Sequence, residues 1–222
     1  MSAILFGSIS TIADTSELQR RSFNEAFESH GLDWRWDRDE YVGMLGSNGG
    51  EDRIDSRADS LGQDVDASAI HRTKSEIFQR KLSESHLSAR PGVVDTVRQA
   101  KERGVKVALV TTTSAENVAA MLGALAPELT EDDFDLVVDS SSVSDPKPDP
   151  AAYAFALERL GERTEDCVAI EDNVGGVQAA MAAGLRCLAF PNENTATHDF
   201  TDADQCLEQV DFDVAHEVIT GS

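Results

Sequence analysis

The chain has 222 residues, of which 41% are hydrophobic, enough to bury one core and a smaller second one. Its 41 acidic residues outnumber 19 basic ones and give a net charge of −22, which excludes nucleic acid and acidic membranes as expected partners because both would repel it. With no apolar run of membrane-spanning length, no signal-peptide pattern and three cysteines without metal-ligand spacing, a cytoplasmic protein with reduced cysteines is expected.

The first expected element is a strand at residues 3–6, a short apolar run bounded by Gly7 and Ser8. Ligands of open α/β sheets bind outside the carboxyl ends of the strands, so residues 7–11 lie where chemistry is expected. This segment offers backbone amides and hydroxyls but no carboxylate, imidazole or thiol.

Residues 16–87 keep a helical spacing of apolar side chains and predict four successive helices, the second of them capped by Asp37. No strand pattern interrupts them. We therefore predict an all-helical domain at residues 16–87, inserted after the first strand.

From residue 88 onward helices and strands alternate. One helix is expected to start at Pro91 and end at Gly104, and the next to start with a capping box of Thr113 and Glu116. The expected strands lie at residues 105–110, 136–138, 167–170 and 185–190, and a closing helical segment at residues 202–219. This alternation predicts an α/β fold with a Rossmann-like, doubly wound parallel sheet, built from residues 1–15 and 88–222.

Polar side chains follow three of these strands. Thr111 and Thr112 offer hydroxyls and helix-terminal amides to an anion, and Lys147, held between prolines, offers a point charge for phosphate. Glu171 and Asp172 are carboxylates suited to Mg²⁺. Taken singly, each group has the alternative reading of a helix cap or a solvated turn, but their common place at one edge of the sheet favours a functional site.

The same residues resemble the motifs of a known family. Thr111, Lys147 with the following Pro-Asp-Pro, and the segments 170–173 and 175–180 look like motifs two, three and four of the haloacid dehalogenase-like hydrolases. Segments 48–54 and 90–93 add a similarity to the branch that holds phosphoglycolate phosphatase, β-phosphoglucomutase and the sugar-bisphosphate phosphatases of carbon-fixation operons. The resemblance implies a Rossmann-like core with a helical cap inserted after motif one, in agreement with the helical periodicity.

Motif one departs from the family pattern Phe-Asp-x-Asp-Gly-Thr-Leu, because residues 6–12 read Phe-Gly-Ser-Ile-Ser-Thr-Ile. Gly7 stands where the family has its nucleophilic aspartate, and Ile9 stands where it has the acid/base aspartate. Glycine can neither attack phosphorus nor bind a metal through a side chain, and isoleucine cannot transfer protons. Ser8 and Ser10 carry hydroxyls, but a serine nucleophile needs a base within hydrogen-bond reach. The sequence thus predicts that no catalytic residue is intact.

The leading hypothesis is a haloacid dehalogenase-like protein that has lost aspartate-based catalysis and binds a phosphorylated small molecule or a protein partner. Mg²⁺ binding at Glu171 and Asp172 is expected to be weakened, because position 7 no longer supplies a carboxylate. Two alternatives stay open, an active Mg²⁺-dependent hydrolase of sugar phosphates or phosphoglycolate-type esters with an unusual mechanism, and an interaction scaffold. The expected phosphate-binding residues are Ser8, Thr111, Thr112 and Lys147, and by resemblance Arg53 and Lys74 face a distal group of the ligand, unless they are surface charges.

Overall fold

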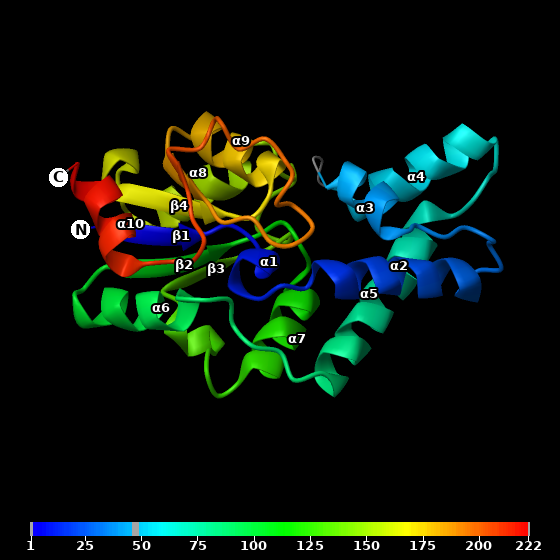
Figure 1. Ribbon diagram of the computed structural model, residues 1–222, viewed down its shortest axis with the longest axis horizontal. Coiled ribbons are helices and arrows are strands. Elements are labelled where there is room, and N and C mark those ends of the chain that lie inside the picture. The colour runs from blue at the N-terminus through cyan, green and yellow to red at the C-terminus, as the bar shows by residue number, and fades with distance from the viewer. Residues whose placement is uncertain (1, 46–48, 222) are drawn as a thin grey trace.

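The computed structural model describes residues 2–45 and 49–221 and has a parallel sheet at its centre (Figure 1). Its strand order is β3-β2-β1-β4-β5-β6, and all neighbouring strands run parallel. The strands are β1 (Ala3–Phe6), β2 (Lys106–Val110), β3 (Leu136–Val138), β4 (Cys167–Glu171), β5 (Arg186–Ala189) and β6 (Gln205–Cys206). The doubly wound α/β fold is therefore confirmed.

Helices cover both faces of the sheet. They are α6 (Val93–Glu102), α7 (Ala115–Leu125), α8 (Ala151–Leu160), α9 (Val174–Ala182) and α10 (Phe212–Thr220), with short 3-10 helices at Glu131–Asp133 and Thr164–Asp166. Ile4 and Phe6 of β1 join the core under α6, α7 and α10, whereas Ala3 and Leu5 join the core under α8 and α9. This alternation explains why β1 is fully buried and apolar throughout.

The segment between β1 and α6 contains the short α1 (Ile9–Ile12) and a group of four longer helices, which we call the helical block. The block comprises α2 (Ser16–Ser29), α3 (Arg38–Met44), α4 (Gly50–Leu61) and α5 (Ala67–Glu84). It lies beyond the end of the sheet (Figure 1) and packs around its own cluster, whose buried aromatic residues are Phe23, Phe27, Trp34, Trp36 and Tyr41. As expected, Asp37 caps α3 by accepting a 2.9 Å hydrogen bond from the Glu40 amide. That residues 16–87 form a separate domain stays a prediction, and part of the segment 48–54, together with residues 46–47, lies outside the described residues.

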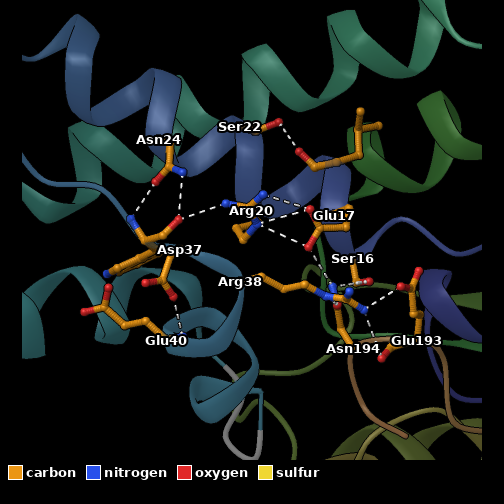
Figure 2. Close-up of polar contacts among 12 residues, drawn as sticks. Ser16, Glu17, Arg20, Ser22, Asn24, Asp37, Arg38, Glu40, Glu193 and Asn194 are labelled. Carbon is orange, nitrogen blue, oxygen red and sulfur yellow. Dashed lines mark hydrogen bonds and ion pairs between the residues drawn. The ribbon is translucent and has the colours of Figure 1, made fainter.

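Two sets of side-chain contacts tie the helical block to the sheet core. On one side, Gln79 of α5 donates a 3.0 Å hydrogen bond to Asn117 of α7. On the other side, Figure 2 shows Arg38 of α3 reaching the turn after β5, where its Nε donates to Asn194 Oδ1 at 2.9 Å and its guanidinium pairs with Glu193 at 2.7 Å. The block is thus fixed over the carboxyl ends of the central strands.

Three local expectations were wrong. The cap of α7 is Ser114, whose Oγ accepts from the Asn117 amide, so the helix starts one residue later than a Thr113 capping box requires. Pro91 precedes α6, because Gly92 turns the chain with a φ of 82° before the helix begins. Residues 202–219 contain β6 ahead of α10, which gives the sheet a sixth strand that is too short for its periodicity to be visible. Among the described residues, none of the helices has the length and apolar character needed to cross a membrane.

Candidate functional site

A cavity of about 900 Å³ lies between the carboxyl ends of the central strands and the helical block. It contains every site residue expected from the sequence except Glu171, which lies behind its floor. The lining residues from that set are Gly7, Ser8, Ile9, Arg53, Lys74, Thr111, Thr112, Lys147 and Asp172. Residues separated by more than a hundred positions are thus brought to one place, at the sheet edge where a parallel fold puts its ligands.

Lys147 forms part of this floor, where acceptors of the protein itself hold its ammonium. Its ammonium donates to the Val110 carbonyl at 2.7 Å, to Glu171 Oε1 at 2.6 Å and to the Gly7 carbonyl, and the residue is only 4% exposed. An ammonium has three N–H groups, so these acceptors use all of them. Lys147 therefore fixes β1, β2 and β4 relative to one another, and Glu171 balances its charge.

Glu171 fills the space that a side chain at position 7 would need. It is fully buried, and its Oε1 also accepts a 2.7 Å hydrogen bond from Tyr153, while Oε2 has no partner among the described residues. Burial raises the pKa of the Glu171 carboxyl, and the Lys147 ammonium opposes that rise. A Cβ added to Gly7 would overlap the carboxyl of Glu171 and the hydroxyl of Tyr153. The site is therefore packed around the glycine.

Asp172 faces the cavity, but both of its oxygens already accept hydrogen bonds. Oδ1 accepts from Ser8 Oγ at 2.6 Å, and from Thr11 Oγ1 and Asn173 Nδ2 at 3.2 Å each. Oδ2 accepts from Asn192 Nδ2 at 2.9 Å. The carboxylate is thereby held in one orientation by neutral donors.

The sequence analysis did not find Tyr153 or Asn192, although both belong to this arrangement. Tyr153 falls on the apolar face of α8, and its position is typical of a core residue. The one signal of a polar role is that a buried tyrosine hydroxyl usually needs a hydrogen-bond partner. Asn192 lies in the turn after β5, at the carboxyl edge of the sheet where a polar side chain is a candidate by position.

Thr111 and Thr112 form the part of the floor that follows β2. Thr111 is 4% exposed and its Oγ1 accepts from the Thr113 amide at 3.2 Å, whereas the Thr112 side chain makes no hydrogen bond with the described residues. Both residues precede α7, which begins after Ser114. Hydroxyls and backbone amides therefore border the cavity on this side.

The helical block contributes the other wall, and Lys74 is its most unusual member. Lys74 is only 4% exposed, so the interpretation of a surface charge is wrong for this residue. Its ammonium donates to Gln19 Oε1 at 3.2 Å and lies 4.8 Å and 5.0 Å from the ring centres of Phe23 and Phe78. Burial, with a smaller effect of the Arg53 charge, lowers the pKa of Lys74 to about 7.

His71 lines the same wall one turn earlier on α5. Burial, together with the charges of Lys74 and Arg53, lowers the pKa of His71 to about 4. Its imidazole is therefore neutral at pH 7, and Arg53 and Lys74 are the expected site residues that bring basic groups to this wall.

Comparisons with known proteins bear on the family and the overall fold of this chain. The family model of the haloacid dehalogenase-like hydrolases matches residues 1–184. Protein CbbY of Cereibacter sphaeroides is 38% identical over 211 residues, which cover 93% of this chain and 91% of that protein. A crystal structure of CbbY from Rhodobacter sphaeroides in complex with phosphate superposes with a TM-score of 0.86 at 38% identity, covering 94% of each chain. A mutant of the same protein in complex with xylulose 1,5-bisphosphate matches equally well, with a TM-score of 0.86.

Proposed function

This chain belongs to the haloacid dehalogenase-like hydrolases, in their phosphatase and phosphomutase branch, and we propose that it binds a phosphorylated small molecule without the aspartate-based phosphoryl transfer of that family. One observation carries the proposal: the cavity has no carboxylate at position 7 or 9, and Glu171 and Tyr153 occupy the space beside Gly7. Ile9 is 4% exposed and apolar, so it cannot exchange protons with a ligand.

The carboxylates that remain do not fit Mg²⁺. This ion requires several oxygen ligands in octahedral geometry, and the described residues hold no group of three His, Cys, Asp or Glu side chains placed for a metal. Asp172 accepts hydrogen bonds at both oxygens, and Glu171 is buried below the floor in its pair with Lys147. We infer that Mg²⁺ binding is weakened in this chain.

Phosphate binding has positive support from the donors that remain. The Thr111 and Thr112 segment borders the cavity on the sheet side, and Arg53 and Lys74 lie on the helical side. In the relative from Rhodobacter sphaeroides, the same fold holds phosphate and a sugar bisphosphate. A ligand with a phosphate at one end and a second anionic or polar group at the other therefore suits both walls of this cavity.

The test combines binding with turnover. Inorganic phosphate and xylulose 1,5-bisphosphate are expected to raise the Tm in a saturable way, and the pure protein is expected to release no phosphate from the bisphosphate with or without MgCl₂. Thr112→Val is expected to weaken the stabilisation, whereas Ser83→Ala, an exposed change on α5, serves as the matched control. Mg²⁺-dependent phosphate release that Thr112→Val reduces would overturn the proposal.

One contact favours a second candidate, a hydrolase with a serine nucleophile. The Ser8 hydroxyl lies 2.6 Å from Asp172 Oδ1, which places a base within reach of a serine on the cavity floor. Mass spectrometry after incubation with the bisphosphate decides between the two functions. A phosphoserine at Ser8 that is absent from the Ser8→Ala variant would favour a slow phosphoryl transfer over the binding function.

A further inference from the structure

The chain buries two lysines beside one cavity, in opposite environments. Lys147 and Lys74 are each 4% exposed and both line the cavity. Lys147 forms a 2.6 Å ion pair with Glu171 and uses its other N–H groups on backbone carbonyls. Lys74 forms no ion pair with any described carboxylate. Its polar contact is the side-chain oxygen of Gln19.

Burial and the like charge of Arg53 on α4 favour the neutral amine of Lys74 over the ammonium. The side-chain oxygen of Gln19 and the rings of Phe23 and Phe78 act in the other direction, because an acceptor oxygen and an aromatic face both attract a cation, but none of them carries a countercharge. The neighbouring His71 is itself uncharged at pH 7. The acidic residues that line the cavity are Glu51, Asp52, Glu76, Glu116 and Asp172, and none of them pairs with Lys74. A lysine that is desolvated and lies next to another cationic group has the properties of an activated amine nucleophile.

We propose that Lys74 is the nucleophile of a carbonyl-binding subsite, which forms a reversible imine with a phosphorylated aldehyde or ketone held in the cavity. The amine attacks the carbonyl carbon, and a proton passes from nitrogen to oxygen to give a carbinolamine. Loss of one water then gives the imine, so no oxidant or reductant is needed. The inference rests on the proposed function and names the ligand class for the same cavity.

The two walls of the cavity explain why the ligand would carry both groups. The sheet wall presents the hydroxyls and amides around Thr111 and Thr112, which suit a phosphate. The helical wall presents the amine of Lys74, which in its neutral form holds an anion less well than a guanidinium does. Open-chain aldose and ketose phosphates carry a phosphate and a carbonyl on one short carbon chain, and about 900 Å³ accommodates them.

Reductive trapping tests the subsite. The intact protein is incubated at pH 7 with pyridoxal 5′-phosphate or dihydroxyacetone phosphate, reduced with sodium borohydride, and mapped by peptide mass spectrometry. The adduct is expected at Lys74, with a rate on the order of tenfold or more above that of the other lysines, because an ordinary lysine is almost fully protonated at this pH. The Lys74→Arg variant is expected to form no adduct at position 74. The Lys81→Arg variant, changed at a lysine that pairs with Glu25, is expected to form the Lys74 adduct at an unchanged rate. Excess inorganic phosphate is expected to slow the formation of the adduct.

Adducts that form equally fast at Lys81, Lys101 and Lys106 would overturn the inference, as would the absence of an adduct at Lys74. The Tm shift caused by inorganic phosphate is measured on the same samples. Stabilisation by phosphate without a Lys74 adduct would refute the carbonyl subsite and leave the proposed function standing. If inorganic phosphate does not raise the Tm at all, the proposed function is refuted, and this inference with it.

Discussion

The hydroxyl of Ser8 donates a 2.6 Å hydrogen bond to Asp172 Oδ1 across the floor of the cavity. Asn192 holds the other oxygen of the same carboxylate at 2.9 Å. In the family that this chain resembles, a carboxylate at position 7 would share a metal ion with this part of the site. In this chain, both oxygens of Asp172 accept hydrogen bonds from neutral donors of the protein.

Millimolar MgCl₂ is therefore expected to leave the Tm unchanged relative to EDTA, both for the free protein and in the presence of inorganic phosphate. The reason is that a metal would first have to displace the donors from Asp172. Thermal unfolding followed by fluorescence gives the measurement, with Asp172→Asn as the control. A rise in Tm with MgCl₂ that is lost in Asp172→Asn would show that Mg²⁺ binds here.

Gly7→Ala is expected to lower the free energy of unfolding by about 1–3 kcal/mol, because the added methyl overlaps Glu171 and Tyr153 in a fully buried site. Urea unfolding measures the change. Gly123→Ala is the matched control: this glycine is exposed within α7, has no atom close to the added Cβ, and is expected to gain roughly 0.5–1 kcal/mol. Equal stability of Gly7→Ala and the natural chain would mean that Glu171 moves aside freely.

The fold could be predicted because its signals are local. The apolar run of β1 and the cap at Asp37 each depend on neighbouring residues, and both were confirmed. The convergence of Thr111, Lys147 and Asp172 followed from a general property of parallel sheets. The boundaries that failed, at α6 and α7, depend on which of several adjacent residues turns the chain.

The different positions of Glu171 and Asp172 could not be predicted from local signals. The sequence presents two adjacent carboxylates, and they were interpreted as a pair. Glu171 is the last residue of β4, and successive side chains of a strand point to opposite sides, so only Asp172 lines the cavity. Tyr153 donates a hydrogen bond to Glu171, and Asn192 donates one to Asp172. Both donors come from distant segments of the chain, and no local sequence pattern predicts such contacts.

Arg38→Ala is expected to loosen α3 from the sheet core. The change removes the 2.9 Å hydrogen bond to the buried Asn194 and the ion pair with Glu193, at a cost of about 0.5–2 kcal/mol. Hydrogen exchange by mass spectrometry is expected to become faster in α3 and in the turn at residues 192–195. Arg98→Ala removes an exposed pair with Asp95 on α6 and should leave α3 unchanged. Unaltered exchange in α3 after Arg38→Ala would show that other contacts hold the block.

Potassium chloride is expected to raise the Tm at pH 7. A net charge of −22 makes the folded chain repel itself, and salt screens that repulsion. A variant with the exposed Asp55, Asp59 and Asp64 changed to Asn serves as the control, because fewer charges leave less repulsion to screen. Its Tm should depend less steeply on salt. An equal salt dependence of both proteins would assign the effect to something other than these charges.

Lys74→Met is expected to stabilise the protein by about 1–3 kcal/mol at pH 7, because it removes a buried amine that lacks a carboxylate partner. Burial lowers the pKa of Lys74 from 10.5 in the unfolded chain to about 7 in the folded one. Between pH 7 and pH 10.5 Lys74 is protonated in the unfolded chain and largely neutral in the folded one. The free energy of unfolding of the natural protein therefore rises with pH in this range, and the stability advantage of Lys74→Met shrinks. Below pH 7 Lys74 is protonated in both states, so this advantage is constant.

Urea unfolding at pH 6, 8 and 10 measures the difference in the free energy of unfolding between Lys74→Met and the natural protein. Lys81→Met, changed at a lysine that pairs with Glu25, serves as the control. An advantage that does not change with pH would mean that Lys74 keeps an ordinary pKa, and would remove the physical basis of its reactivity toward carbonyl groups.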